Sequence, residues 1–189
     1  MFILDASTSV KSDNFEKMKE FVKGFLSEAD IDGGAVRVGV AMYSTGSKIM
    51  FDLNSYTNKE DVFDAIDSIY FWKGGTNTAK ALEIIRTRMF TVSKGDRLNV
   101  DNVAIILTDG KSTIKKERTI PNADRARNQE IHIYSIGIGL QQTKELQKIA
   151  NEPADENMFA LSDFEALEGL EKELFSLVCG ETFRFVYFY

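Results

Sequence analysis

The segment 103-VAIILTDG-110 is an apolar run, closed by Thr108, that ends on Asp109. Nearly continuous apolar strands are typical of parallel sheets, because helices cover both faces of such sheets. The segment therefore predicts an α/β domain in which this strand is buried at the centre of the sheet. It also predicts that the carboxylate of Asp109 stands at the carboxyl end of the strand.

A second segment, 2-FILDASTSV-10, has the same form near the beginning of the chain. A short apolar run leads into Asp5, and three residues with hydroxyl groups follow it: Ser7, Thr8 and Ser9. In open α/β sheets, ligands bind beyond the carboxyl ends of the strands, where the winding of the sheet reverses. We therefore expect Asp5 and Asp109 to lie at one end of the sheet, with hydroxyl groups beside them.

Strand-like and helix-like patterns alternate along the whole chain. Strands are predicted at 2–5, 36–43, 48–53, 103–108, 131–138 and 158–161. A first helix is predicted to be capped by Asp13, and further helices at 59–69, 78–90, 123–128, 143–150 and 164–178. A tight turn at 44–47 makes 48–53 an antiparallel edge strand. The pattern predicts a doubly wound, mostly parallel central sheet with one antiparallel edge strand and helices on both faces, which is a Rossmann-like α/β fold.

The length of 189 residues predicts one domain, which we place at residues 1–179. The remaining residues, 180–189, include the aromatic segment 181-ETFRFVYFY-189, which alternates like a strand. This segment could begin another domain, add an edge strand or be a cloning remnant, and the sequence leaves these alternatives open. The first strand follows Met1 directly and no signal-peptide pattern precedes it, so we expect the domain to be part of a longer chain.

Composition and charge exclude several classes of function. The formal net charge of −6 argues against a general nucleic-acid-binding protein, which would carry a basic face. No apolar run approaches the roughly 20 residues of a membrane-spanning helix. The chain has one cysteine, Cys179, so neither a two-cysteine metal site nor a disulfide within the chain can form. The one histidine, His132, falls in a predicted strand, where a packed side chain is expected.

The predicted end of the sheet is rich in oxygen donors. The segment 73-KGGTNT-78 adds Thr76 at the start of a predicted helix, where two glycines allow a close approach of the backbone. Two carboxylates and three hydroxyl groups would then come together, from Asp5, Ser7, Ser9, Thr76 and Asp109. Hard oxygen donors of this kind suit a Mg²⁺-like cation. Each residue alone is also typical of turns and helix caps, and the combination favours a metal site.

These residues resemble a known family. Asp5-x-Ser7-x-Ser9, Thr76 and Asp109 match all five positions of the metal-ion-dependent adhesion site of von Willebrand factor type A domains, which are also called integrin I-like domains. The flanking segments FILDASTSV, GGTNTAKAL and VAIILTDGKS resemble extracellular-matrix members, such as the A domains of collagens and matrilins. The resemblance covers residues 1–179 and implies that the first and fourth strands are adjacent at the centre of the sheet.

The resemblance also implies a function. In the family, the five residues hold a divalent cation, for which we expect Mg²⁺, with Mn²⁺ and Ca²⁺ as alternatives. The cation accepts a carboxylate from a partner, here an extracellular-matrix or cell-surface protein, with collagen as one candidate. The implied location is extracellular and secreted. Family members often join a cysteine before the first strand to one after the last helix, so the resemblance implies that Cys179 forms a disulfide in a longer chain.

Residues beside the predicted site could contribute to partner binding. Four basic residues follow Asp109 closely and should line the rim of the site: Lys111, Lys115, Lys116 and Arg118. They could steer an acidic partner toward the site or simply form a solvated loop. Trp72, shortly before Thr76, is expected to pack in the core, with an exposed contact to a partner as the alternative.

Two other functions compete with metal-dependent adhesion. The first is a structural module for matrix assembly whose metal site is not used for binding. The second is an enzyme such as a metal-dependent phosphatase with Asp5 as nucleophile. Such enzymes typically have a second aspartate two positions on, where this chain has Ser7, and no histidine or lysine is evident in the site. The sequence therefore predicts a binding module and not an enzyme.

Overall fold

Six strands form one sheet in the part of the chain that the computed structural model describes, residues 1–180. The strands are β1 (Phe2–Asp5), β2 (Val40–Tyr43), β3 (Ser47–Phe51), β4 (Asn102–Thr108), β5 (Ile131–Ile138) and β6 (Met158–Leu161). Their order is β3-β2-β1-β4-β5-β6, and only the β2–β3 pair is antiparallel. This arrangement confirms the predicted doubly wound, mostly parallel sheet with an antiparallel edge strand.

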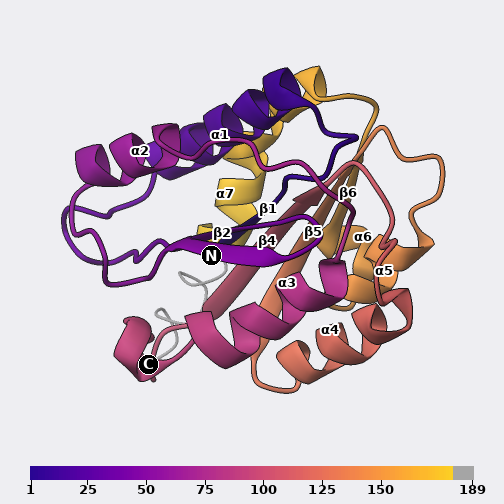
Figure 1. Cartoon of the computed structure of the whole chain (residues 1–189). Coiled ribbons are helices and arrows are strands. Elements are labelled where there is room, and N and C mark those ends of the chain that lie inside the picture. Colours follow the sequence, from indigo (N-terminus) through magenta and orange to yellow (C-terminus); the bar gives the residue numbers. More distant parts are fainter. Residues whose placement is uncertain (181–189) are drawn as a thin grey trace.

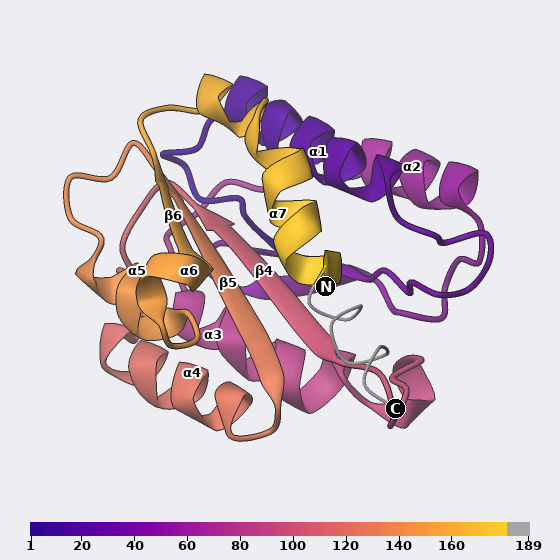
Figure 2. The same cartoon turned by 180° about the vertical axis from the view of Figure 1, so that it is seen from behind.

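Seven α-helices of the described residues cover the sheet. They are α1 (Ser12–Ser27), α2 (Lys59–Asp67), α3 (Thr78–Ile84), α4 (Thr119–Arg127), α5 (Lys144–Ile149), α6 (Ala154–Asn157) and α7 (Leu170–Gly180). Helices α1, α2 and α7 lie on one face of the sheet, and α3, α4 and α5 lie on the other (Figure 1, Figure 2). Within residues 1–180, no helix has the length and apolarity needed to cross a membrane.

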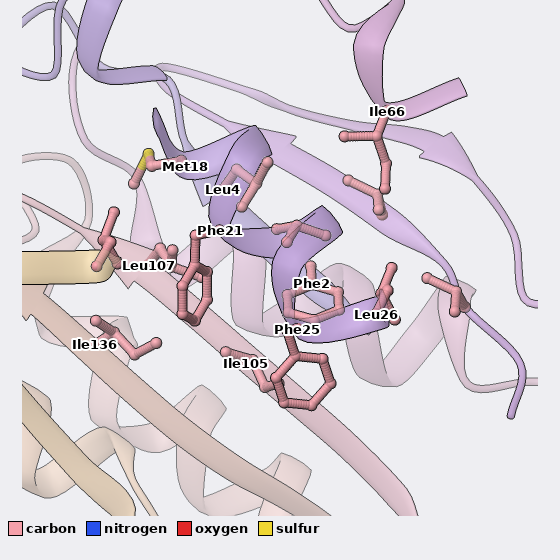
Figure 3. Packing of buried hydrophobic residues seen from close by; sticks show 14 of the residues in the cluster. Phe2, Leu4, Met18, Phe21, Phe25, Leu26, Ile66, Ile105, Leu107 and Ile136 are labelled. Atoms are coloured by element: carbon pink, nitrogen blue, oxygen red, sulfur yellow. The ribbon is translucent and has the colours of Figure 1, made fainter. Parts of the chain in front are cut away.

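Each face of the sheet has its own apolar cluster. On the side of α1 and α7, Phe2 packs against Phe25 with ring centroids 5.3 Å apart (Figure 3). Phe25 also packs against Phe175, with ring centroids 5.4 Å apart. On the other side, Ile3 and Ile106 of the central strands pack in one cluster with residues of α3 and α4. Because successive residues of a strand point to opposite faces, the apolar central strands contribute to both clusters.

The winding reverses between β1 and β4, as the resemblance implied. Leu4 of β1 is in register with Leu107 of β4, so the carboxyl ends of the two strands lie side by side. On the other side of β1, Asp5 is in register with Tyr43 of β2. The loops after β1 and β4 therefore leave the sheet at neighbouring positions and diverge toward helices on opposite faces, which opens the crevice expected at such a point.

The predicted cap of the first helix is wrong. Helix α1 begins at Ser12 and its N-cap is Lys11, which has a φ of 66° and makes no side-chain cap. The first helical hydrogen bond runs from the Phe15 N–H to the Lys11 carbonyl at 3.1 Å. Asp13 lies inside the first turn instead, where its negative charge still favours the helix N-terminus.

Several predicted boundaries also move. Strand β2 starts at Val40 rather than at 36, because the Val36 N–H binds the Asp30 carbonyl at 2.9 Å and takes this segment away from the ladder. Strand β3 ends at Phe51 rather than at 53, and α4 starts at Thr119 rather than at 123.

Two predicted helices are not uniform. The predicted helix 78–90 is α3 followed by a π-helical turn at Ile85–Met89. The predicted helix 164–178 is a short 3₁₀ turn at Glu165–Leu167 and then α7, with Gly169 directly before Leu170. Glycine favours such an interruption because it is a poor helix former.

Candidate metal centre

The Asp5 carboxylate is held in place by two hydrogen bonds at the end of β1. The side chain is fully buried. Its Oδ1 accepts a hydrogen bond from the Ser7 N–H at 2.8 Å, and its Oδ2 accepts one from the Thr108 hydroxyl at 2.6 Å. Because Thr108 is the last residue of β4, the two central strands together orient this carboxylate.

Ser7, Ser9 and Asp109 form a continuous chain of polar contacts. The Oγ atoms of Ser7 and Ser9 lie 3.1 Å apart, and the Ser9 hydroxyl donates to Asp109 Oδ1 at 2.8 Å. This hydrogen bond joins the loop after β1 to the residue that follows β4, because Ser9 and Asp109 are one hundred positions apart in the chain. The predicted proximity of Asp5 and Asp109 is present in the fold.

Thr76 approaches the same point from the loop before α3. A methyl group placed on Gly110 would lie 3.9 Å from Thr76 Oγ1 and 4.0 Å from Ser9 Oγ, so both hydroxyl groups face one small space. The Thr76 N–H donates to Thr113 Oγ1 at 3.0 Å, and the Thr76 carbonyl accepts from the Thr113 N–H at 2.9 Å. The loop after β4 thus fixes the backbone of Thr76. All five predicted positions come together.

The loop that carries Thr76 depends on a close approach at Gly74. The Thr8 N–H donates to the Gly74 carbonyl at 2.9 Å, and the Gly74 N–H donates back to Thr8 Oγ1 at 3.2 Å. A Cβ atom on Gly74 would lie 2.7 Å from Thr45 Oγ1, which is closer than real Cβ contacts allow. A glycine is therefore required for this loop to reach the loop after β1.

Electrostatics at this point favour a cation. Burial raises the pKa of Asp5 to about 6, although hydrogen bonds from Thr108 and Ser7 oppose the rise. Burial also raises the pKa of the half-buried Asp109. Among residues 1–180, neither carboxylate forms an ion pair with a basic side chain. The two carboxylates are withdrawn from water and have no basic partner, and three hydroxyl groups lie beside them. Oxygen donors of this kind are the ligands that a hard divalent cation prefers.

The donor set of this site combines two carboxylates with three hydroxyl groups. In the described part of the chain, no three His, Cys, Asp or Glu side chains gather in a group that could hold a metal. Hydroxyl oxygens supply most of the donors here, and they carry no formal charge. With Asp5 and Asp109 ionised, the two carboxylates would match but not exceed the charge of a divalent cation, so the protein brings no excess negative charge that would repel a further negative ligand.

Comparison with known families identifies the domain. A model of the von Willebrand factor type A domain matches residues 1–173. This chain belongs to that family. The match covers nearly all of the described residues, including the five positions of the candidate metal centre.

Relatives of this A domain occur in longer chains. The A domain is 33% identical over 186 residues to the collagen alpha-4(VI) chain of Mus musculus, covering 97% of this chain and 8% of the relative. It is 29% identical over 181 residues to matrilin-1 of Gallus gallus, covering 96% of this chain and 36% of the relative. This chain therefore spans about a third of matrilin-1 and less than a tenth of the collagen chain.

Solved structures agree with the fold. Proximal thread matrix protein 1 from the mussel byssus superimposes with a TM-score of 0.87 and is 27% identical, covering 94% of this chain and 47% of that chain. Another structure of that mussel protein, with the same TM-score, is described as having a zinc-occupied MIDAS motif, the abbreviation for metal-ion-dependent adhesion site.

Sequence reasoning missed several residues that position the site of the A domain. Thr108 orients Asp5, and Thr113 holds the backbone of Thr76. Tyr43 is buried beside Asp5, and burial followed by the charge of Asp5 raises the pKa of its phenol well above the usual range. The position of Thr108 next to Asp109 was a usable signal, whereas Tyr43 and Thr113 reach the site only through the fold.

The basic residues predicted for the rim are all exposed in the A domain: Lys111, Lys115, Lys116 and Arg118. The first of them, Lys111, donates to Gln142 Oε1 at 2.5 Å. Since the N–H groups of Thr113 and Ile114 both bind the Thr76 carbonyl, Lys111 and Lys115 flank a segment that touches the site.

Two further side chains outside the cluster have clear positions in the A domain. Trp72 is 42% exposed, so the expectation that it packs in the core is wrong. His132 is packed as expected, with Nε2 2.6 Å from Asn157 Oδ1 and its ring centroid 4.6 Å from that of Tyr134. Trp72 therefore stays a candidate contact, and His132 has a structural role.

Proposed function

We propose that this A domain is an extracellular-matrix module that binds protein partners through a divalent cation. The observation that carries the proposal is the convergence of two carboxylates and three hydroxyl groups where the winding of the sheet reverses. The cation would be held by these five residues: Asp5, Ser7, Ser9, Thr76 and Asp109. A bound cation would supply an open coordination position for a carboxylate of the partner.

Each residue has a distinct role in the proposal. The three hydroxyl groups supply neutral oxygen donors. Asp5 and Asp109 supply the negative charge, and the hydrogen bonds from Thr108 and Ser9 hold them in fixed orientations. Fixed donors lower the cost of ordering the site when the cation binds. Mg²⁺ is the preferred ion because it favours hard oxygen ligands and keeps several waters, and Mn²⁺ and Ca²⁺ are the alternatives.

The comparisons support the matrix assignment. Collagen VI chains, matrilins and a byssal thread protein are matrix proteins rather than enzymes, which also supports the prediction that this domain is not an enzyme. The same relatives support an extracellular, secreted location. The zinc-occupied MIDAS motif of the mussel protein supports a divalent cation at the corresponding place here. Collagen is a candidate partner, as are other matrix or cell-surface proteins that present a carboxylate.

A structural module for matrix assembly is the second candidate function. It is favoured by the similarity to proximal thread matrix protein 1, a protein of the mussel byssus. In this alternative the cation stabilises the domain, and other faces make the contacts with partners. The two functions differ in whether partner binding needs the cation.

Calorimetry with Mg²⁺ and Mn²⁺ tests the site. The wild-type domain should bind one cation, and Asp5→Asn should abolish the heat of binding. Glu28→Gln is the matched control, because Glu28 is an exposed carboxylate beyond the end of α1. Equal affinity in wild type and Asp5→Asn would refute the assignment of the site. Loss of binding in the control as well would indicate a nonspecific effect of charge.

A second experiment separates the two functions. Binding to immobilised collagen and to a matrix extract is measured in Mg²⁺ and in EDTA, for wild type and Asp5→Asn. Adhesion through the cation predicts that EDTA and the substitution abolish binding to the same extent. Binding that persists in EDTA would favour the structural module.

A further inference from the structure

Positive charge is concentrated on two segments near the candidate metal centre. Residues 80–88 and 111–118 contain seven basic and two acidic residues, whereas the whole chain has 23 basic and 29 acidic residues. The first segment covers most of α3 and the π-helical turn that follows it, and the second belongs to the connection between β4 and α4. This segregation of charge creates a surface that attracts anionic groups, although the domain as a whole is acidic.

The two basic segments meet at Glu83. Lys80, Glu83 and Arg86 are three residues apart, so they share one side of α3. Lys80 Nζ lies 2.8 Å from Glu83 Oε1. The hydrogen bond from Lys80 lowers the pKa of the Glu83 carboxyl, and the charges of Lys80, Arg86 and Lys115 add to this effect. One carboxylate therefore faces three cationic side chains, Lys80, Arg86 and Lys115, which we call the α3 cationic cluster.

Arg86 is the least satisfied member of the α3 cationic cluster. The residue is half-buried, and its Nε is buried without a hydrogen-bond acceptor among the described residues. Its guanidinium group also forms no ion pair within residues 1–180. A charged group that is partly withdrawn from water and lacks an acceptor gains from an incoming anion, because hydrogen bonds between charged partners are strong.

Arg86 also lies in an irregular part of the helix. The Phe90 N–H binds the carbonyl of Ile85, five residues earlier, at 2.9 Å, and this bond closes the π-helical turn at Ile85–Met89. Single π-helical turns are rare and occur frequently at functional sites. The turn carries Arg86 and Arg88, so the irregularity of the helix coincides with its positive charge.

The α3 cationic cluster is continuous with the candidate metal centre. The N–H of Ile114, the residue before Lys115, donates to the Thr76 carbonyl at 3.1 Å. Helix α3 begins two residues after Thr76, and Lys80 lies in its first turn. Lys80 and Lys115 therefore flank Thr76 from two different segments of the chain. A partner that reaches the metal centre meets the cluster directly beside it.

We propose that the α3 cationic cluster binds carboxylates of an acidic protein segment that extends from the candidate metal centre along α3. The choice of an acidic protein segment rests on the proposed function, in which the partner presents a carboxylate to the cation. One segment with several carboxylates serves both the cation and the cluster, and it gives Arg86 the acceptors that the described residues do not provide. Charge complementarity and continuity with the metal centre point to this occupant.

Glu83 competes with the partner in this arrangement. Its carboxylate is paired with Lys80, and both side chains are 43% exposed. Exposed ion pairs of this kind contribute little to stability, so a partner carboxylate can replace Glu83 at small cost. The proposal therefore predicts that removal of the Glu83 charge strengthens partner binding.

Fluorescence anisotropy with a labelled decaglutamate peptide tests the proposal. The dissociation constant is measured in EDTA and in Mg²⁺, for wild type and for the double variant Lys80→Gln/Arg86→Gln. We expect the double variant to bind about five-fold more weakly, or worse, in both conditions, because it lacks the charged donors of the bound state. The matched control is Lys148→Gln/Lys172→Gln, which removes the same charge from exposed lysines of α5 and α7. Because salt screens distant charges, the control should change the dissociation constant less than about two-fold.

Glu83→Gln distinguishes a direct contact from a structural defect in α3. We expect this variant to bind the peptide about three-fold more tightly than wild type, since it frees Lys80 from its ion pair. A damaged helix would instead weaken binding, and circular dichroism verifies that each variant is folded. Equal dissociation constants for wild type and Lys80→Gln/Arg86→Gln would overturn the proposal. So would weaker binding by Glu83→Gln, or no binding of the peptide by wild type in either condition.

Two further comparisons separate this inference from the proposed function. If Mg²⁺ fails to tighten peptide binding while the double variant still loses affinity, the cluster is supported and the metal-dependent function is contradicted. If Mg²⁺ tightens binding and the double variant has no effect, only the cluster is refuted. A heparin-derived hexasaccharide that binds more tightly than the peptide, and loses affinity in the double variant, would assign the cluster to a sulfated polysaccharide and refute the acidic protein segment.

Discussion

Hydroxyl groups decide the local chemistry of the candidate metal centre. The Thr108 hydroxyl donates to Asp5, and the Ser9 hydroxyl donates to Asp109, so each carboxylate is oriented by a neutral donor. Neutral donors orient a carboxylate without neutralising it, whereas a lysine or arginine would compete with a cation for the same charge. The residue types therefore suit a site that must stay open for a metal ion.

Replacing Ser9 by alanine should weaken cation binding. The substitution removes one predicted ligand and also the 2.8 Å hydrogen bond that orients Asp109. We expect the affinity for Mn²⁺ to fall at least ten-fold, a loss of about 1.4 kcal/mol or more. Calorimetry measures it, with Ser162→Ala as control, because Ser162 also donates to an aspartate, Asp163, at 2.9 Å. An unchanged affinity in Ser9→Ala would exclude Ser9 from the site.

At the level of elements, a buried lysine joins α1 to the end of α2. Lys19 is 4% exposed, and its Nζ donates to the carbonyl groups of Asp67 and Ile69 at 3.1 Å each. It also forms an ion pair with Glu16 at 2.8 Å. Carbonyl groups at a helix C-terminus have no partners within the helix, so Lys19 satisfies acceptors that the fold would otherwise bury.

Lys19→Met should destabilise the domain although it keeps the apolar stem. Two carbonyl groups and Glu16 lose their donor, and we expect the free energy of unfolding to fall by about 2 kcal/mol. Urea unfolding measures this change. Lys23→Met is the control, because Lys23 forms a more exposed ion pair with Asp67 and should cost less than about 1 kcal/mol. Similar losses in both variants would contradict the role given to Lys19.

The loop after β4 should steer acidic partners. We expect the association rate of a labelled hexaglutamate peptide, measured by stopped flow in Mg²⁺, to fall several-fold when four residues are replaced by glutamine: Lys111, Lys115, Lys116 and Arg118. Steering acts at a distance and is screened over about 10 Å at 0.1 M salt, so the wild-type rate should fall with salt and the variant rate should not. If the association rates of wild type and variant changed with salt in the same way, the four basic residues would not steer the partner and would only form a solvated loop.

At the scale of the whole molecule, the cation should stabilise the fold. The candidate centre joins the loops after β1 and β4 with the loop before α3, so a ligand there binds the folded chain only. At one hundred times its dissociation constant, such a ligand adds about 2.7 kcal/mol, or roughly 5–10 °C in the melting temperature of a domain of this size. Scanning calorimetry with Mg²⁺ and with EDTA checks the shift. A shift that persists in Asp5→Asn would place the stabilising ion elsewhere.

The sequence by itself determined the class of fold and the composition of the candidate site. Apolar runs and helical spacing depend on local periodicity, so the six strands, the antiparallel edge strand and six of the seven helices were predicted in the correct order. The short helix α6 was not predicted, because four residues carry too little periodicity. The five oxygen-bearing residues could also be named, because four of them end or follow a predicted strand and Thr76 directly precedes a predicted helix. Boundaries were less accurate where long-range contacts compete with local preference, as at Lys11 before α1 and at Val36 before β2.

The tertiary structure alone decided which distant groups meet. The hydrogen bonds of Thr108 to Asp5 and of Thr113 to Thr76 join residues far apart in the chain, and no local pattern encodes them. The exposure of Trp72 and the burial of Lys19 likewise follow from packing between layers. Side-chain burial depends on what lies opposite in space, and only the folded chain specifies that.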